Sequence, residues 1–106
     1  MIKITVIKHA GQYQGFVISG HAGYAEEGQD IICSAVSALA VTTVNAIDSL
    51  AHVYVEAEQD EGYLSCQFPK GINSEGTLLM DAMILGLQQI RESYGKRYTQ
   101  LRFEEV

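Results

Sequence analysis

Two long runs of helical periodicity dominate this chain of 106 residues and limit the folds open to it. The first extends from about Asp30 to Leu50 and the second from Ser74 to about Tyr94. Apolar residues recur every three or four positions in both, which predicts one buried stripe on each helix. The expected stripes are Val36, Leu39, Ala40, Thr43, Ile47 and Leu50 in the first helix, and Leu79, Met83, Leu87, Ile90 and Tyr94 in the second.

Capping residues stand at the ends of both runs. Asp30 and Ser74 belong to the residue types preferred at helix N-caps, and Gly95 fits a helix C-terminus. Shorter segments with strand-like alternation surround the helices. We expect strands at residues 1–8, 14–19, 52–58, 63–68 and about 98–104, with turns at 9–12 and 59–62, and with Leu101 and Phe103 pointing inward.

The predicted element order is ββαββαβ, which indicates an α+β fold. Two amphipathic helices bury their stripes most simply on one face of a sheet, which gives a two-layer sandwich. We expect a mostly antiparallel five-stranded sheet with both helices on one face, although the strand order cannot be read from the sequence. Residues 1–106 are expected to form a single domain.

Charge and cysteine content narrow the classes of function. Thirteen acidic and seven basic side chains give a formal net charge of −6, which disfavours a nucleic-acid surface. An acidic surface suits a basic partner, although a solvated acidic surface on a cytosolic protein explains the charge equally well. Two cysteines and no apparent signal segment favour the cytoplasm. Polar residues interrupt the apolar run at 31–50, which we expect to be too polar for a membrane span.

A glycine-rich loop leads into the first helix and carries the residues most suggestive of chemistry. Cys33 falls in the first helical turn, where free N–H groups and the helix dipole favour a thiolate. His21 precedes it in the loop and is the best candidate for a general base, whereas His9 and His52 lie in less suitable places. The preferred role of Asp30 is to cap the helix, and the second choice is to orient the imidazole. Its negative charge would raise the pKa of Cys33. Ser37 lies one turn beyond Cys33 on the same helix face.

Other interpretations of these residues are available. Cysteine is often a buried small hydrophobe, and Cys66 alternates with apolar residues on a predicted strand, so it is expected in the core. The loop glycines resemble a phosphate cradle only superficially, since no lysine follows and Glu26 and Glu27 would repel phosphate. The cysteine and histidine spacings are too irregular for a zinc site, and no cofactor is expected. Tyr24 could stack on a substrate, but an exposed tyrosine needs no role.

The segment from Gly20 to Leu39 resembles the signature of the bacterial ribosomal-processing cysteine proteases, the Prp family. The matching residues read Gly20-His21-Ala22-x-Tyr24-Ala25-x-x-Gly28-x-Asp30-Ile31-Ile32-Cys33-Ser34-Ala35-Val36-Ser37-Ala38-Leu39. The resemblance implies a homodimeric cytoplasmic endopeptidase that removes a short N-terminal extension from a basic large-subunit ribosomal protein, after an aromatic-rich stretch.

The resemblance also implies roles for single residues. Cys33 matches the nucleophile, His21 the general base, and Asp30 and Ser37 the supporting positions. Residues 22–29 match a mobile loop that admits the substrate, for which we name Gly20, Ala22, Gly23, Tyr24 and Gly28 as substrate-binding positions. Ser34 stands where the family commonly has alanine. In the hypothesised reaction, N–H groups at the helix start hold the oxyanion.

Two other functions remain open from the sequence. One is a non-catalytic factor that binds or assembles ribosomal proteins through its acidic surface, in which case Cys33 is a packed core residue. The other is a redox-sensing thiol, which lacks a resolving cysteine nearby because Cys66 lies on a distant strand.

Overall fold

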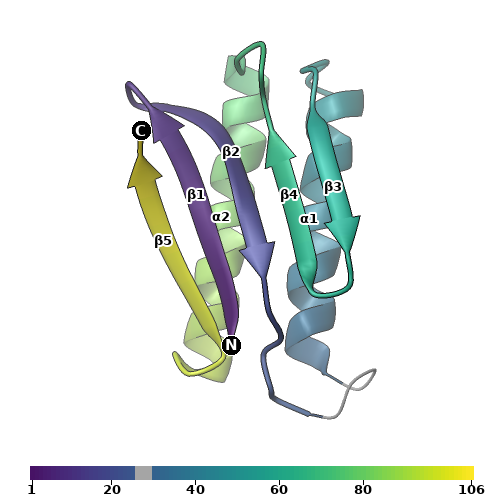
Figure 1. Ribbon diagram of the computed structural model, residues 1–106, viewed down its shortest axis with the longest axis vertical. Coiled ribbons are helices and arrows are strands. Elements are labelled where there is room, and N and C mark those ends of the chain that lie inside the picture. The colour runs from purple at the N-terminus through teal and green to yellow at the C-terminus, as the bar shows by residue number, and fades with distance from the viewer. Residues whose placement is uncertain (26–29) are drawn as a thin grey trace.

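The computed structural model describes residues 1–25 and 30–106 and has the element order ββαββαβ (Figure 1). These described residues form five strands and two helices, arranged as one sheet packed against a helical layer. The elements are β1 (Ile2–His9), β2 (Gln12–Ser19), α1 (Ile31–Ser49), β3 (Glu56–Asp60), β4 (Tyr63–Gln67), α2 (Ser74–Tyr94) and β5 (Thr99–Glu105).

The strands form one mixed sheet in the order β3-β4-β2-β1-β5, and both helices cover the same face of it (Figure 1). Three neighbouring pairs are antiparallel: β1 with β2, β2 with β4, and β3 with β4. Only β5 runs parallel to its neighbour β1 among the described strands. The predicted α+β sandwich is therefore confirmed, and the structure supplies the strand order that the sequence left open.

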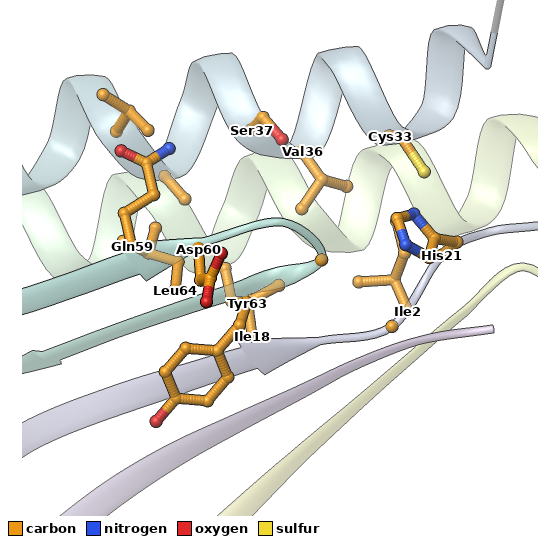
Figure 2. A pocket seen from close by; sticks show the side chains of 14 residues that line it. Ile2, Ile18, His21, Cys33, Val36, Ser37, Gln59, Asp60, Tyr63 and Leu64 are labelled. Carbon is orange, nitrogen blue, oxygen red and sulfur yellow. The ribbon is translucent and has the colours of Figure 1, made fainter. Parts of the chain in front are cut away.

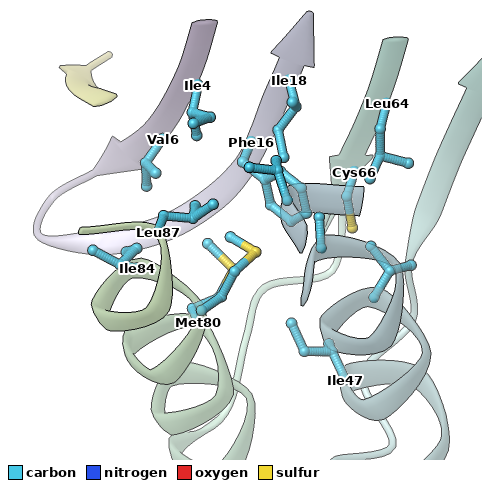
Figure 3. Close-up of a cluster of buried hydrophobic side chains, with 14 of the residues drawn as sticks. Ile4, Val6, Phe16, Ile18, Ile47, Leu64, Cys66, Met80, Ile84 and Leu87 are labelled. Atoms are coloured by element: carbon cyan, nitrogen blue, oxygen red, sulfur yellow. The ribbon is translucent and has the colours of Figure 1, made fainter. Parts of the chain in front are cut away.

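The register of the sheet sets which side chains meet the helices. Ile4 pairs with Ile18 and Val6 with Phe16, so these four side chains share the face that α1 and α2 cover. Cys66 pairs with Phe16 from β4 and is fully buried, as predicted. Figure 3 shows how the helices complete this core from the other side, with Ile47 from α1 and Met80, Ile84 and Leu87 from α2.

The predicted helix stripes are largely correct but extend too far. Val36, Ala40, Thr43 and Ile47 are buried, whereas Leu50 at the C-cap of α1 is 72% exposed. Phe103 pairs with Val6 and so faces the helix layer, as predicted, yet its side chain remains 52% exposed. Tyr94 is likewise exposed at the end of α2. Helical and strand periodicity predict a direction, but burial also requires a neighbouring element to cover that position.

The second hairpin begins later than predicted. Residues 52–55 are not strand, and β3 starts at Glu56. Gln59 and Asp60 belong to β3, so the connecting turn is Glu61–Gly62, shorter than the expected 59–62. His52 adopts a positive φ of 56°, a conformation that continues neither a helix nor a strand.

The N-cap of α2 also differs from the prediction. Asn73, and not Ser74, caps the helix: its Oδ1 accepts a hydrogen bond from the Gly76 N–H at 2.8 Å. Its Nδ2 donates to the Ala51 carbonyl at 2.8 Å, which ties the start of α2 to the segment after α1. The Ser74 hydroxyl instead donates to the neighbouring carboxylate of Glu75, at 3.2 Å. Gly95 ends the helix as predicted, with a φ of 101°.

Helix α1 is apolar enough, by length and composition, to cross a membrane, with a mean hydropathy of 1.6. Core helices of soluble proteins and signal sequences share this length and composition, so these two properties do not distinguish a membrane span from a core helix. In the structure this helix buries Ile32, Val36, Ala40 and Ile47 in the core shared with the sheet and α2.

Mutation can distinguish which of the two candidate residues, Asn73 or Ser74, caps the N-terminus of α2. Asn73→Ala removes both side-chain hydrogen bonds and should lower the free energy of unfolding by about 1 kcal/mol. Ser74→Ala is the matched control and should change the free energy of unfolding by less than about 0.5 kcal/mol, because the Ser74 side chain is exposed and its hydroxyl bonds to the exposed neighbour Glu75. Urea unfolding followed by circular dichroism measures both. Equal losses in the two variants would contradict the assignment of Asn73 as the cap.

Candidate active site

The first turn of α1 is built by the side chain of Asp30. Its Oδ1 accepts hydrogen bonds from the N–H groups of Ile32, at 3.0 Å, and Cys33, at 3.1 Å. Its Oδ2 accepts one from the Tyr24 N–H at 3.1 Å, so the same carboxylate holds the preceding loop. Asp30 therefore caps the helix, as the sequence predicts, and its described hydrogen bonds do not include the imidazole of His21.

These hydrogen bonds also decide the charge of Asp30. Burial of the carboxyl group favours its neutral form, since only 7% of the residue is exposed. The N–H groups of Cys33, Tyr24 and Ile32 outweigh burial and hold the pKa of Asp30 below its ordinary value. The residue therefore carries a negative charge at neutral pH, next to the cysteine.

Cys33 is partly exposed and its sulfur has a backbone donor. The Ala22 N–H donates to Sγ at 3.3 Å, which brings the glycine-rich loop against the helix start. Burial raises the pKa of the Cys33 thiol; the Ala22 N–H opposes this shift and the Asp30 carboxylate adds to it. The pKa of Cys33 is therefore raised overall, and the lowered pKa expected from the helix dipole is not found in the resting structure. The predicted effect of the Asp30 charge is confirmed.

His21 lies beside Cys33 in the same cleft. Figure 2 shows the Cys33 sulfur pointing from α1 toward the imidazole ring. No hydrogen bond joins the two side chains among the residues that the structure describes. Such bonds are often long in resting enzymes and tighten when substrate binds. The other two histidines lie elsewhere: His9 contacts the Val106 carbonyl at the far end of β1, and His52 follows the far end of α1 (Figure 1).

A cleft of about 170 Å³ opens between the N-terminal half of α1 and the β3–β4 hairpin (Figure 2). Cys33 and Ser37 lie on its helix side, one turn apart as predicted. The helix wall is mostly apolar, and Gln59, which shares the helix-facing side of the hairpin with Leu64, adds a polar side chain. Its lining comprises Ile2, Ile18, Gly20, His21, Cys33, Val36, Ser37, Ala40, Val41, Gln59, Asp60, Gly62, Tyr63 and Leu64.

The expected substrate-binding loop is only partly at the cleft. Gly20 lines it, and Ala22 is buried against Cys33. Gly23 is exposed, with a φ of +73°, and does not line the cleft. Tyr24 packs edge-on against Tyr94 and Tyr98, with ring centroids 5.8 and 5.2 Å away, and is also absent from the cleft lining. Gly28 and the rest of residues 26–29 lie outside the described part of the chain.

Sequence analysis missed the contribution of the β3–β4 hairpin. Gln59, Asp60, Gly62 and Tyr63 lie about thirty residues after Cys33 and carry no motif that links them to it. The pairing of β4 with β2 brings this hairpin to the edge of the sheet beside α1. In the part of the chain that the structure describes, no group of three metal-ligating side chains could hold a metal ion.

A family model matches residues 1–99 of this chain, and its description is cysteine protease Prp. This chain belongs to the Prp family of cysteine proteases. A Bacillus subtilis relative, the ribosomal processing cysteine protease Prp, is 34% identical over 101 residues, covering 89% of this chain and 90% of the relative. A Staphylococcus aureus relative of the same name is 29% identical over 99 residues, covering 91% and 93%.

Solved structures agree with membership of the Prp family. The ribosomal processing protease Prp of S. aureus, solved with a covalently linked product peptide, superposes with a TM-score of 0.90 at 28% identity, covering 98% of this chain and all of that one. A Streptococcus mutans protein superposes with a TM-score of 0.85 at 29% identity, covering 100% of this chain and 99% of that one. This member of the Prp family is therefore a cysteine protease, as the sequence resemblance implied.

The effect of the Asp30 charge on the pKa of Cys33 can be measured through the rate at which the thiol is alkylated. Asp30→Asn keeps an N-cap oxygen but removes the negative charge, so the pKa of Cys33 should fall. The rate of alkylation by iodoacetamide at neutral pH should then rise, and its pH profile should move to lower pH. Mass spectrometry should find Cys66 unlabelled in the folded protein, because it is fully buried and its pKa is raised to about 11.

Asp48→Asn is the matched control, because it removes the same charge from the exposed far end of α1. Its alkylation profile should coincide with that of the unmodified protein. A profile of Asp30→Asn that stays in place or moves to higher pH would contradict the role given to the Asp30 charge.

Proposed function

We propose that this Prp-family protease cuts its peptide substrate with Cys33 as the nucleophile and His21 as the general base. The observation that carries this proposal is their shared position in the cleft, with the sulfur directed at the imidazole (Figure 2). Asp30 and Ser37 act as supporting residues, the first by fixing the start of α1 and the second by lining the cleft one turn further on.

In the proposed reaction His21 takes the proton from the Cys33 thiol as the sulfur attacks the peptide carbonyl. The imidazolium then protonates the departing amine, and the acyl group stays on the sulfur as a thioester. Water, deprotonated by the same imidazole, hydrolyses the thioester and returns the free thiol. The raised Cys33 pKa favours proton transfer during attack over a thiolate held permanently at rest.

The backbone donor for the oxyanion differs from the one expected from the sequence. The helix-start N–H groups of Ile32 and Cys33 already donate to Asp30 Oδ1, and the Ser34 N–H donates to the Asp30 carbonyl. The Ala22 N–H instead points at the sulfur itself. In this proposal it lies beside the forming S–C bond and stabilises the negative charge on the carbonyl oxygen.

The substrate in this proposal is the N-terminal extension of a basic large-subunit ribosomal protein precursor, removed in the cytoplasm. The net charge of −6 supports a basic partner. β3 supports an extended peptide, because it is an edge strand that borders the cleft and carries exposed Glu56, Glu58 and Asp60. The names of the Prp relatives support ribosomal processing.

The precursor peptide of the host's own ribosomal protein tests the reaction directly. The unmodified protein should release two fragments, identified by mass spectrometry. Cys33→Ser and His21→Ala should fold normally by circular dichroism and lower kcat by at least about a hundredfold. Cys66→Ala and His9→Ala are the matched controls and should retain cleavage, since neither side chain reaches the cleft. Cleavage by Cys33→Ser at the unmodified rate would exclude the mechanism.

The proposal includes a homodimer of two single-domain chains. Two leucines, Leu78 and Leu85, are 68% and 56% exposed and stand two helical turns apart on α2, which supports an apolar contact with a second copy. Light scattering after size-exclusion chromatography should give twice the chain mass of 11.6 kDa at micromolar concentration. A monomer mass across that range would remove the homodimer from the proposal.

A further inference from the structure

The turn between β3 and β4 touches the ring of His21. A methyl group placed on Gly62 would lie 2.8 Å from Nε2 and 3.2 Å from Cε1 of that ring. Real Cβ atoms essentially never approach another heavy atom closer than 3.0 Å. Either the imidazole or the turn would therefore have to move if residue 62 carried a side chain.

A backbone hydrogen bond joins the same turn to the base of the loop. The Gly20 N–H donates to the Gly62 carbonyl at 2.9 Å, immediately before His21 in the chain. Gly62 thus contacts the His21 ring and also fixes the backbone one residue before it. Both contacts come from a hairpin that lies far from the histidine in sequence.

We propose that Gly62 is a positioning residue for His21, an inference that rests on the proposed role of His21 as general base. The missing side chain leaves the space in which the imidazole lies against the turn, facing Cys33 across the cleft. A ring displaced by a fraction of an ångström loses alignment with the sulfur and the leaving amine, which costs rate in the chemical step and little in binding.

Backbone conformation alone would also favour glycine at this position, so the proposal needs a control. Gly62 has a φ of +66°, in the left-handed region that side chains rarely adopt. Gly11 occupies the turn between β1 and β2 with a φ of +78°, and no atom lies within 4 Å of a Cβ there. The two glycines share the conformational requirement and differ in the contact with the imidazole.

The experiment compares Gly62→Ala with Gly11→Ala. Both should lower the melting temperature by similar amounts, because both force alanine into a left-handed turn. Gly62→Ala should lower kcat for the precursor peptide by about tenfold or more with little change in KM. Gly11→Ala should keep the unmodified kcat. In NMR spectra the ring resonances of His21 should shift in Gly62→Ala alone, with those of His9 and His52 as internal references.

A second variant, Gly62→Asn, tests the same contact in case Gly62→Ala does not fold. Asparagine tolerates a positive φ better than alanine does but carries the same Cβ atom. It should therefore be the more stable variant and still show the lowered kcat and the shifted His21 resonances.

Two results would overturn the inference. One is equal kcat values for the Gly62 and Gly11 variants, and the other is an unchanged His21 spectrum in the Gly62 variants. His21→Ala, assayed beside them, separates this failure from that of the proposed function. Unmodified cleavage by His21→Ala would refute the general base itself, whereas its inactivity beside an active Gly62→Ala would refute only the role of Gly62.

Discussion

The Asp30 carboxylate is the interaction on which the site depends. This one side chain accepts hydrogen bonds from three backbone N–H groups, two in the first turn of α1 and one in the loop at Tyr24. It therefore fixes where the helix begins, and with it the direction of the Cys33 side chain. The same charge opposes ionisation of the neighbouring thiol. The residue that builds the site therefore adds to the effect of burial, which raises the pKa of the Cys33 thiol.

The rest of the site comes from elements that meet only in the folded chain. Helix α1 supplies the sulfur, the loop supplies the imidazole and the Ala22 N–H, and the β3–β4 hairpin supplies the opposite wall. Tyr24 connects the loop to the far end of the chain through Tyr94 and Tyr98. Contacts on two sides thus hold the loop that carries His21, one at the hairpin turn and one at the tyrosine cluster.

Local patterns predicted the parts of this structure that depend on neighbouring residues. Strand alternation around Ile4 and Phe16 and the helical stripe through Val36 and Ile47 led to the correct elements and the correct buried faces. The same patterns do not account for the exposure of Leu50, the C-cap of α1, or of Phe103, which faces the helix layer opposite Val6 but remains 52% exposed. Asn73 displaced Ser74 as the cap because its amide also reaches the Ala51 carbonyl, a contact made only when α1 and α2 pack together.

Local sequence patterns were enough to predict the α+β class, the capped start of α1, and the presence of a cysteine and a histidine close together in one short segment. These follow from hydrogen bonds and periodicities that span only a few residues. Tertiary structure decided the strand order, the parallel pairing of β5 with β1, and the approach of Gly62 to the His21 ring. Those features join residues tens of positions apart, and their free energy comes from packing one element against another, which no local pattern records.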